Sequence, residues 1–275
     1  MASDVLVSTD WVADNLNNPK VKLIEVDVDT NAYDEGHAPG AVGFNWTSQL
    51  QDQTRRDIIT QEGLEQLLSD AGVGNDDTIV LYGDNNNWFA AYAFWLLEMY
   101  GHKDIKLMDG GRKKWTEENR ATTKDAPSPK KSSYKATAPK AELRAKRDQV
   151  LSALKNGKNA LVDVRSPAEY NGEIMAPPGL PETAQRMGHI PGAANVPWAQ
   201  AVREDGTFKS KDELAQLYGG KGVTKDKEVI AYCRIGERSS HTWFALKHLL
   251  DYPNVRNYDG SWTEYGSLID VPIEK

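Results

Sequence analysis

The chain has 275 residues, of which 39% are hydrophobic and 27% charged, and its formal net charge is −7. This length suits two domains of about 130 residues each. The acidic balance argues against nucleic acid or an anionic membrane surface as the main partner. The sequence shows neither an apolar run of the roughly 20 residues that a membrane span needs nor a basic and apolar leader, so we expect a cytoplasmic protein.

The first half alternates short apolar runs with longer helical stretches. Apolar runs at residues 21–27, 78–82 and 105–109 are predicted strands, and residues 61–71 and 89–100 are predicted helices. This alternation is typical of βαβ units, in which helices cover a mainly parallel sheet. Residues 122–139 then contain mostly Pro, Ser, Thr, Ala and Lys, a composition that indicates a linker.

The second half repeats the first. Its predicted strands lie at residues 160–163, 228–232 and 255–260, with a helix at 211–218. Three matched pairs are each 150 residues apart: Tyr82 with Tyr232, Leu96 with Leu246, and Asp109 with Asp259. An offset held over this span indicates a duplicated unit. The predicted fold is α/β, with two tandem domains at residues 1–121 and 143–275 joined by a linker at 122–142.

A Gly-His-x-Pro-Gly-Ala turn occurs in both halves, around His37 and His189. Its presence in both favours a structural role over catalysis. Asp27 and Asp163, which we take as equivalent, are 136 residues apart, whereas the histidines are 152 apart, so the second half has 16 extra residues within 171–186. Long loops are often functional. This insertion is either a lid whose Arg186 faces an anion or a surface excursion.

The only cysteine of the chain, Cys233, follows the apolar run 228–232. Two serines come soon after it, and a segment with helical periodicity follows, with Trp243, Leu246 and Leu250 on one face. The prediction is a strand, a tight loop and a helix. Amide groups at a helix N-terminus and the nearby cations of Arg234 and Arg238 stabilise a thiolate, so we expect Cys233 to be ionised.

The segment Cys233-Arg-Ile-Gly-Glu-Arg238, followed by serine, resembles the active-site loop of the rhodanese family of sulfurtransferases. The resemblance extends to the tandem plan of the whole chain. It implies thiosulfate sulfurtransferase activity in which Cys233 takes sulfur as a persulfide and passes it to cyanide or a thiol, including a protein thiol. It implies no metal or organic cofactor. The residues expected to bind the donor are Arg234, Ile235, Gly236, Glu237 and Arg238, with Arg186 from the insertion.

The tandem resemblance also implies that the first half is catalytically silent. Gly83 occupies the place of Cys233, and the loop from Gly83 to Trp88 has neither thiol nor cation. In the second half Asp163 and Arg165 follow a strand, and strand ends of parallel sheets meet at one edge, so we expect them to brace the Cys233 loop. Related enzymes often have a basic residue where this chain has Glu169.

Three other functions remain open. Family members that prefer 3-mercaptopyruvate have an active-site loop that resembles C-G-[ST]-G-x-[ST] and lacks paired arginines. The loop of this chain therefore favours thiosulfate. Cysteine-dependent phosphatases and arsenate reductases are a different class, and the phosphatase loop has five residues between cysteine and arginine, whereas this chain has four between Cys233 and Arg238. A non-enzymatic sulfur carrier is the third alternative, which a turnover measurement distinguishes from an enzyme.

Overall fold

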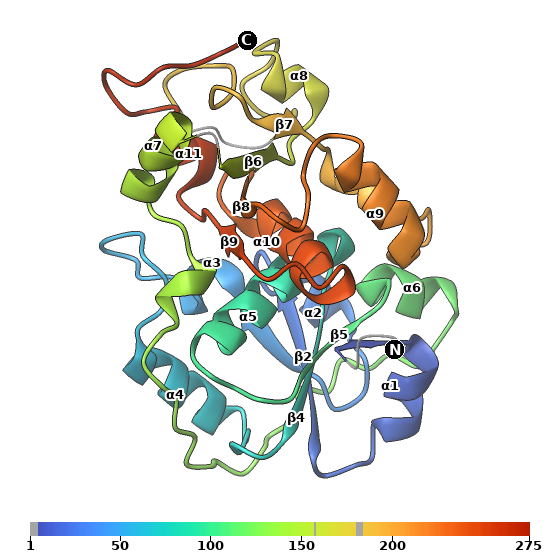
Figure 1. The fold of residues 1–275 in the computed structure, drawn as a ribbon. Coiled ribbons are helices and arrows are strands. Elements are labelled where there is room, and N and C mark those ends of the chain that lie inside the picture. The colour runs from blue at the N-terminus through green and yellow to red at the C-terminus, as the bar shows by residue number, and fades with distance from the viewer. Residues whose placement is uncertain (1–4, 157, 180–183) are drawn as a thin grey trace. The chain divides into compact units, whose positions relative to one another are not determined.

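The computed structural model describes residues 5–156, 158–179 and 184–275, which form two compact units (Figure 1). The first unit extends to Lys140 and includes Glu204–Thr207, and the second contains Ala141–Arg203 and Phe208–Lys275. The segment expected to be a linker belongs to the first unit as far as Lys140. Within it, the buried Tyr134 places its hydroxyl 3.0 Å from Nδ1 of His102.

The first unit contains a five-stranded parallel sheet in the order β1-β5-β4-β2-β3. Its central strands β2 and β4 are buried along most of their length, as expected where helices cover both faces. The strands are β1 (Leu6–Val7), β2 (Val21–Asp27), β3 (Val42–Asn45), β4 (Thr78–Tyr82) and β5 (Ile105–Met108). The helices are α1 (Thr9–Asn15), α2 (Asn31–Glu35), α3 (Trp46–Gln49), α4 (Gln61–Asp70), η1 (Asn85–Asn87), α5 (Trp88–Met99) and α6 (Gly111–Glu117).

The second unit contains a four-stranded parallel sheet in the order β7-β6-β8-β9. The strands are β6 (Asn159–Asp163), β7 (Ala194–Asn195), β8 (Glu228–Tyr232) and β9 (Val255–Asn257). The helices are η2 (Ala141–Leu143), α7 (Arg147–Asn156), α8 (Pro167–Tyr170), η3 (Trp198–Ala201), α9 (Lys211–Gly219), α10 (Glu237–Phe244), the π-helical turn η4 (Ala245–Leu249) and α11 (Ser261–Tyr265). Two parallel sheets flanked by helices confirm the predicted fold class (Figure 1). Within the described ranges, no helix is both long and apolar enough to cross a bilayer.

The strand register corrects one equivalence between the halves. Tyr82 lies opposite Glu25, and its counterpart Tyr232 lies opposite Asp163. Glu25, and not Asp27, is therefore the partner of Asp163, at an offset of 138 residues. Since the histidine turns are 152 residues apart, the second unit has 14 extra residues between these points and not 16. The error arose because two acidic residues end β2 on the same face, and only backbone pairing distinguishes them.

The two histidine turns have the same structural task. Each imidazole stacks on a tyrosine ring, with centroids 3.7 Å apart at His37 and 3.5 Å apart at His189. The backbone of His37 pairs with Thr123 through bonds of 2.9 and 2.8 Å, and that of His189 pairs with Glu274 through bonds of 2.8 and 3.0 Å. Each turn therefore holds the segment that follows the last helix of its own unit.

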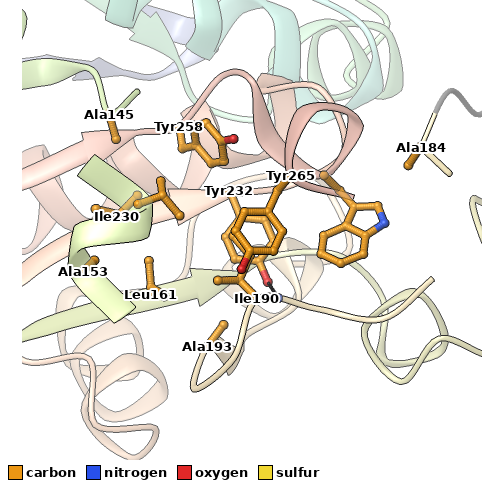
Figure 2. Packing of buried hydrophobic residues seen from close by; sticks show 12 residues of the cluster. Ala145, Ala153, Leu161, Ala184, Ile190, Ala193, Ile230, Tyr232, Tyr258 and Tyr265 are labelled. Atoms are coloured by element: carbon orange, nitrogen blue, oxygen red, sulfur yellow. Dashed lines mark hydrogen bonds between the residues drawn. The ribbon is translucent and has the colours of Figure 1, made fainter. Parts of the chain in front are cut away.

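The core of the second unit forms around the end of β8 (Figure 2). The rings of Tyr232, Tyr258 and Tyr265 are buried there with Ile190 and Ile230. The hydroxyl of Tyr232 accepts a 3.1 Å bond from the Ile190 amide, drawn in Figure 2. This packing fixes the residue directly before Cys233, so the position of the cysteine is set by the core.

The first unit contains buried carboxylates at the corresponding sheet edge. Asp27 is 1% exposed and accepts a 2.7 Å bond from the Asp84 amide, while Glu25 accepts a 2.5 Å bond from Arg112 and another bond from the Tyr82 hydroxyl. Burial, with the charges of Glu25 and Asp84, raises the pKa of Asp27 from 3.8 to about 9. Ionisation of Asp27 therefore opposes folding.

We expect Asp27→Asn to stabilise the protein at neutral and alkaline pH. A raised carboxyl pKa contributes stability that is present below the unfolded pKa and is lost as pH rises toward the folded value. The variant keeps the acceptor for the Asp84 amide and has no carboxyl proton to lose on unfolding. Thermal and urea unfolding should show its advantage growing by more than about 1 kcal/mol between about pH 5 and pH 8. Exposed Asp76→Asn is the control, and an advantage independent of pH would contradict the prediction.

Candidate active site

Cys233 lies in the loop between β8 and α10 and is completely buried. Its amide donates a 3.0 Å bond to the hydroxyl of Ser261, and its carbonyl accepts a 3.0 Å bond from the Trp262 amide. The carbonyl of Arg234 accepts a further 3.0 Å bond from the amide of Thr263. The first turn of α11 thus fixes the loop by its backbone, as is required of a precisely placed nucleophile.

Gly236 gives the loop its shape. It has φ = 103°, a conformation that favours glycine, and an added Cβ would lie 2.8 Å from Cα of Asp259. In this conformation its amide donates to Cys233 Sγ at 3.1 Å. The residue is needed for both the turn into α10 and a hydrogen bond to sulfur.

Four polar groups surround Cys233 Sγ. Besides the Gly236 amide, the hydroxyls of Ser239 and Ser261 lie at 3.7 and 4.0 Å. The fourth group is a carboxylate: Oε2 of Glu237 lies 3.3 Å from Sγ and accepts the thiol proton in a hydrogen bond. Glu237 is only 3% exposed, so this contact is sheltered from water.

The surroundings favour a neutral thiol and not the thiolate expected from sequence. Burial raises the pKa of Cys233, and the charge of Glu237 raises it further. The charge of Arg238 and the hydrogen bonds from Ser239 act in the opposite direction but do not outweigh burial. This direction is opposite to the expectation from sequence, which counted cations near the sulfur but neither its complete burial nor the position of Glu237 against it.

Arg238 forms a buried ion pair with Glu169 of α8. Its Nη1 and Nη2 atoms lie 3.1 and 3.0 Å from the two carboxylate oxygens, and its Nε lies 3.7 Å from Glu237. Arg238 is 4% exposed and Glu169 is 1% exposed. Two parallel bonds of this kind hold a guanidinium in one orientation. The geometry favours a role in positioning Glu237 and the loop over direct capture of a donor.

Glu169 also caps the helix that carries it. Its carboxylate accepts bonds of 3.0 and 2.9 Å from the amide and hydroxyl of Ser166 in a capping box. Burial by itself would raise the pKa of Glu169, but the bonds and charge of Arg238, together with the bonds from Ser166, outweigh it and lower the pKa. The departure from the basic residue of related enzymes thus coincides with an internal partner for Arg238.

Asp163 and Arg165 form a second buried pair at the end of β6. Nη2 of Arg165 lies 2.6 Å from Asp163 and 2.7 Å from the Gly188 carbonyl, and the guanidinium lies 4.5 Å from the centre of the Trp262 ring. Trp262 holds the Cys233 carbonyl, so this pair supports the loop through α11. The contacts agree with the bracing role that we expect for Asp163 and Arg165.

The remaining expected donor ligands lie in different surroundings. Arg234 and Ile235 are half-buried on the loop itself. Arg186 donates to the carbonyls of Gly266, Leu268 and Val271 at 3.2, 2.5 and 3.0 Å. These bonds tie the end of the insertion to the C-terminal segment and favour a structural role. Residues 180–183 of the insertion lie outside the described residues, so the lid hypothesis is not tested there.

The equivalent loop of the first unit has no room for a cysteine. A Cβ on Gly83 would lie 2.1 Å from the carbonyl oxygen of Val26. The following residues Asn85, Asn86 and Asn87 all have positive φ, between 46° and 64°. Asn87 caps the bend by accepting from the Gly83 amide at 3.0 Å. This loop has a different backbone path from the Cys233 loop.

Sequence reasoning assigned no site role to Ser239 or Ser261, which contact the sulfur. A signal for Ser261 was available, because the 150-residue offset aligns it with Gly111 after a strand end. Ser239 could not be told from a helix-capping serine. Among residues 5–156, 158–179 and 184–275, no group of three or more His, Cys, Asp or Glu side chains is placed to hold a metal ion.

We expect Arg238 and Glu169 to be strongly coupled in stability. Arg238→Met leaves a buried carboxylate without its cation, and Glu169→Gln leaves the guanidinium without its anion, at a cost of about 3 kcal/mol each. The double variant should lose much less than the sum, because neither charge is stranded. Urea unfolding measures all three, with exposed Arg147→Ala as a control near the wild-type midpoint. Additive losses would show that the pair acts independently.

Comparison with known proteins agrees with the duplicated architecture. The model of the rhodanese-like domain matches residues 8–118 and 146–268. A Saccharopolyspora erythraea protein provisionally named a thiosulfate sulfurtransferase is 61% identical over 272 residues, covering 98% of this chain and 96% of its own. The sulfur carrier protein TtuD of Thermus thermophilus is 55% identical over 276 residues, covering 99% and 97%. The solved 3-mercaptopyruvate sulfotransferase SseA of Escherichia coli superposes with a TM-score of 0.80 at 30% identity, covering 94% and 98%. The chain therefore belongs to the rhodanese family and carries two rhodanese-like domains.

Proposed function

We propose that this protein is a thiosulfate sulfurtransferase that carries sulfur as a persulfide on Cys233. The observation that carries the proposal is the convergence of hydrogen-bond donors on the only cysteine, with the Gly236 amide at 3.1 Å and the Ser239 hydroxyl at 3.7 Å. Such donors stabilise negative charge on sulfur during nucleophilic catalysis. Relatives named for sulfur transfer and sulfur carriage support the same chemistry.

The reaction has two half-steps. The thiolate of Cys233 attacks the outer sulfur of thiosulfate, and the bond to the inner sulfur breaks with its electron pair on the departing sulfite. The enzyme then holds a Cys233 persulfide. A thiolate or cyanide attacks the outer sulfur of that persulfide, and the Cys233 thiolate leaves. No cofactor is needed for either displacement.

We assign the contact with the donor's oxyanion to Arg234. It lies on the loop and is half-buried, whereas Arg238 is held by Glu169. A guanidinium fork matches the oxygens of thiosulfate in shape and charge. Backbone groups of Ile235 and Gly236 complete the cradle. Arg186 is a weaker candidate because it binds backbone carbonyls. The first unit is catalytically silent in this scheme, since its loop excludes a side chain at Gly83.

Two neighbouring functions are supported by specific relatives. SseA is named for 3-mercaptopyruvate, but the loop here has two arginines against one carboxylate, and this net positive charge suits the dianion thiosulfate. TtuD is named as a sulfur carrier, so a persulfide that passes to a protein thiol is the closer alternative. A reactive thiol that must stay reduced suits the cytoplasm, where we place the protein. Repeated turnover with a small thiol or cyanide distinguishes an enzyme from a carrier.

Thiosulfate should add one sulfur atom to the wild-type protein, visible by intact mass spectrometry. Cyanide should remove it and release thiocyanate. Cys233→Ser should gain no sulfur, because the chain contains no other cysteine. Circular dichroism checks that the variant is folded. A sulfur gain that persists in Cys233→Ser, or rapid hydrolysis of an aryl phosphate by a wild type that ignores thiosulfate, would sink the assignment.

Arg234→Ala should reduce kcat/KM for thiosulfate by about 10- to 100-fold, the size of a charge-assisted hydrogen bond of about 1.5–3 kcal/mol. The loss should be smaller with an uncharged organic persulfide donor, which has no oxyanion to bind. Arg147→Ala removes an exposed arginine elsewhere in the second unit and serves as the control. Equal losses with both donors would mean that Arg234 shapes the loop and does not bind the anion.

A further inference from the structure

We propose that Glu237 is the proton acceptor that activates Cys233, an inference that rests on the proposed sulfur transfer. The carboxylate oxygen lies 3.3 Å from Sγ, within the reach that proton transfer requires. Both side chains are enclosed, with Cys233 at 0% and Glu237 at 3% exposure. Only a thiolate attacks sulfur efficiently, so a thiol held neutral by burial needs a base within contact distance.

The charges around the sulfur explain why one proton is shared. Removing the thiol proton to solvent would leave two negative charges 3.3 Å apart in a buried site, which is strongly unfavourable. Moving the proton from Sγ to Glu237 keeps the net charge of the site unchanged. The thiolate that forms is then stabilised by the Gly236 amide and the charge of Arg238.

Three other carboxylates near the loop are each paired with an arginine, whereas Glu237 lies against the sulfur. Arg238 of α10 is held by Glu169 of α8, and Asp163 of β6 is held by Arg165. After β9, Asp259 accepts bonds of 2.8 and 2.9 Å from Arg144. Arg234 adds one positive charge on the loop. Arg238, through its 3.7 Å contact, keeps Glu237 directed at the sulfur and is a positioning residue.

The proton balance is complete over one cycle. The thiol proton of Cys233 passes to Glu237, and the thiolate displaces sulfite from thiosulfate to give the persulfide. When the acceptor removes the outer sulfur, the departing Cys233 thiolate takes the proton back from Glu237. The resting thiol and carboxylate are restored. No oxidant, reductant or metal enters either step.

Glu237→Gln tests the proposal through pH profiles, which a merely structural role would not change in the same way. In the wild type, alkylation of Cys233 by iodoacetamide and persulfide formation from thiosulfate should both be nearly independent of pH between about 6 and 8, because the proton is shared internally. In Glu237→Gln the thiol must lose its proton to solvent, so both rates should rise about tenfold per pH unit below the thiol pKa. At about pH 6 the variant should be at least tenfold slower than the wild type.

Two further variants complete the test. Glu237→Asp should keep a flat profile at a reduced rate, because the carboxylate remains but is withdrawn by one methylene. Glu213→Gln, at the capping box of α9, should match the wild type. A wild type whose rates rise tenfold per pH unit, with Glu237→Gln faster at neutral pH, would overturn the inference and show Glu237 to be a charge that only suppresses ionisation. Because alkylation needs no sulfur donor, a flat alkylation profile without sulfur uptake would sustain the role of Glu237 and refute thiosulfate as donor.

Discussion

A chain of buried polar contacts determines the state of this active site. It runs from the Cys233 sulfur to Glu237, from Glu237 to Arg238, and from Arg238 to Glu169. Each charged member is almost entirely excluded from water, so none can change its charge without affecting the next. Arg238, which the sequence indicates as a donor ligand, is held within this series of contacts. Burial and then the charge of Glu237 raise the pKa of the Cys233 thiol, which lies beside the carboxylate that we propose as its base.

The two units show how one backbone plan supports different chemistry. In both, the hydroxyl of a tyrosine at the end of a central strand accepts a bond from the amide of the residue directly after the turn's histidine. The donors are Ala38 at 3.0 Å and Ile190 at 3.1 Å. In both, the next residue's carbonyl is held by the start of the last helix. The units differ directly after that tyrosine, where the carbonyl of Val26 fills the space that a side chain at Gly83 would need. The close approach of this carbonyl and the left-handed backbone of Asn85, Asn86 and Asn87 thus distinguish the Gly83 loop from the loop that carries the cysteine.

The equivalent carboxylates of the two units are paired with arginines from different elements. Asp163 is paired with Arg165, two residues further along the same chain segment. Its counterpart Glu25 is paired with Arg112, which lies in α6, the last helix of the first unit. Each arrangement leaves one carboxylate and one guanidinium at the same sheet edge. The first unit has a further buried carboxylate at Asp27, whose pKa is raised by burial and by the charges of Glu25 and Asp84. The two copies of one fold therefore differ in how their buried carboxylates are paired.

The sequence by itself determined the duplication, the alternating strands and helices, the rhodanese resemblance and the position of the single cysteine, because these depend on local periodicity and on residue identity at fixed spacing. The 150-residue offset that relates Tyr82 to Tyr232 survived in the strand register, whereas the equivalence of Asp27 and Asp163 did not. Only the tertiary structure decided the direction in which the pKa of Cys233 shifts and the partner that Arg238 binds. Both depend on which carboxylates, 4 residues away at Glu237 and 69 residues away at Glu169, reach the sulfur and the guanidinium in a medium of low dielectric. A count of charges along the chain contains neither the distance nor the burial that sets the sign of these interactions.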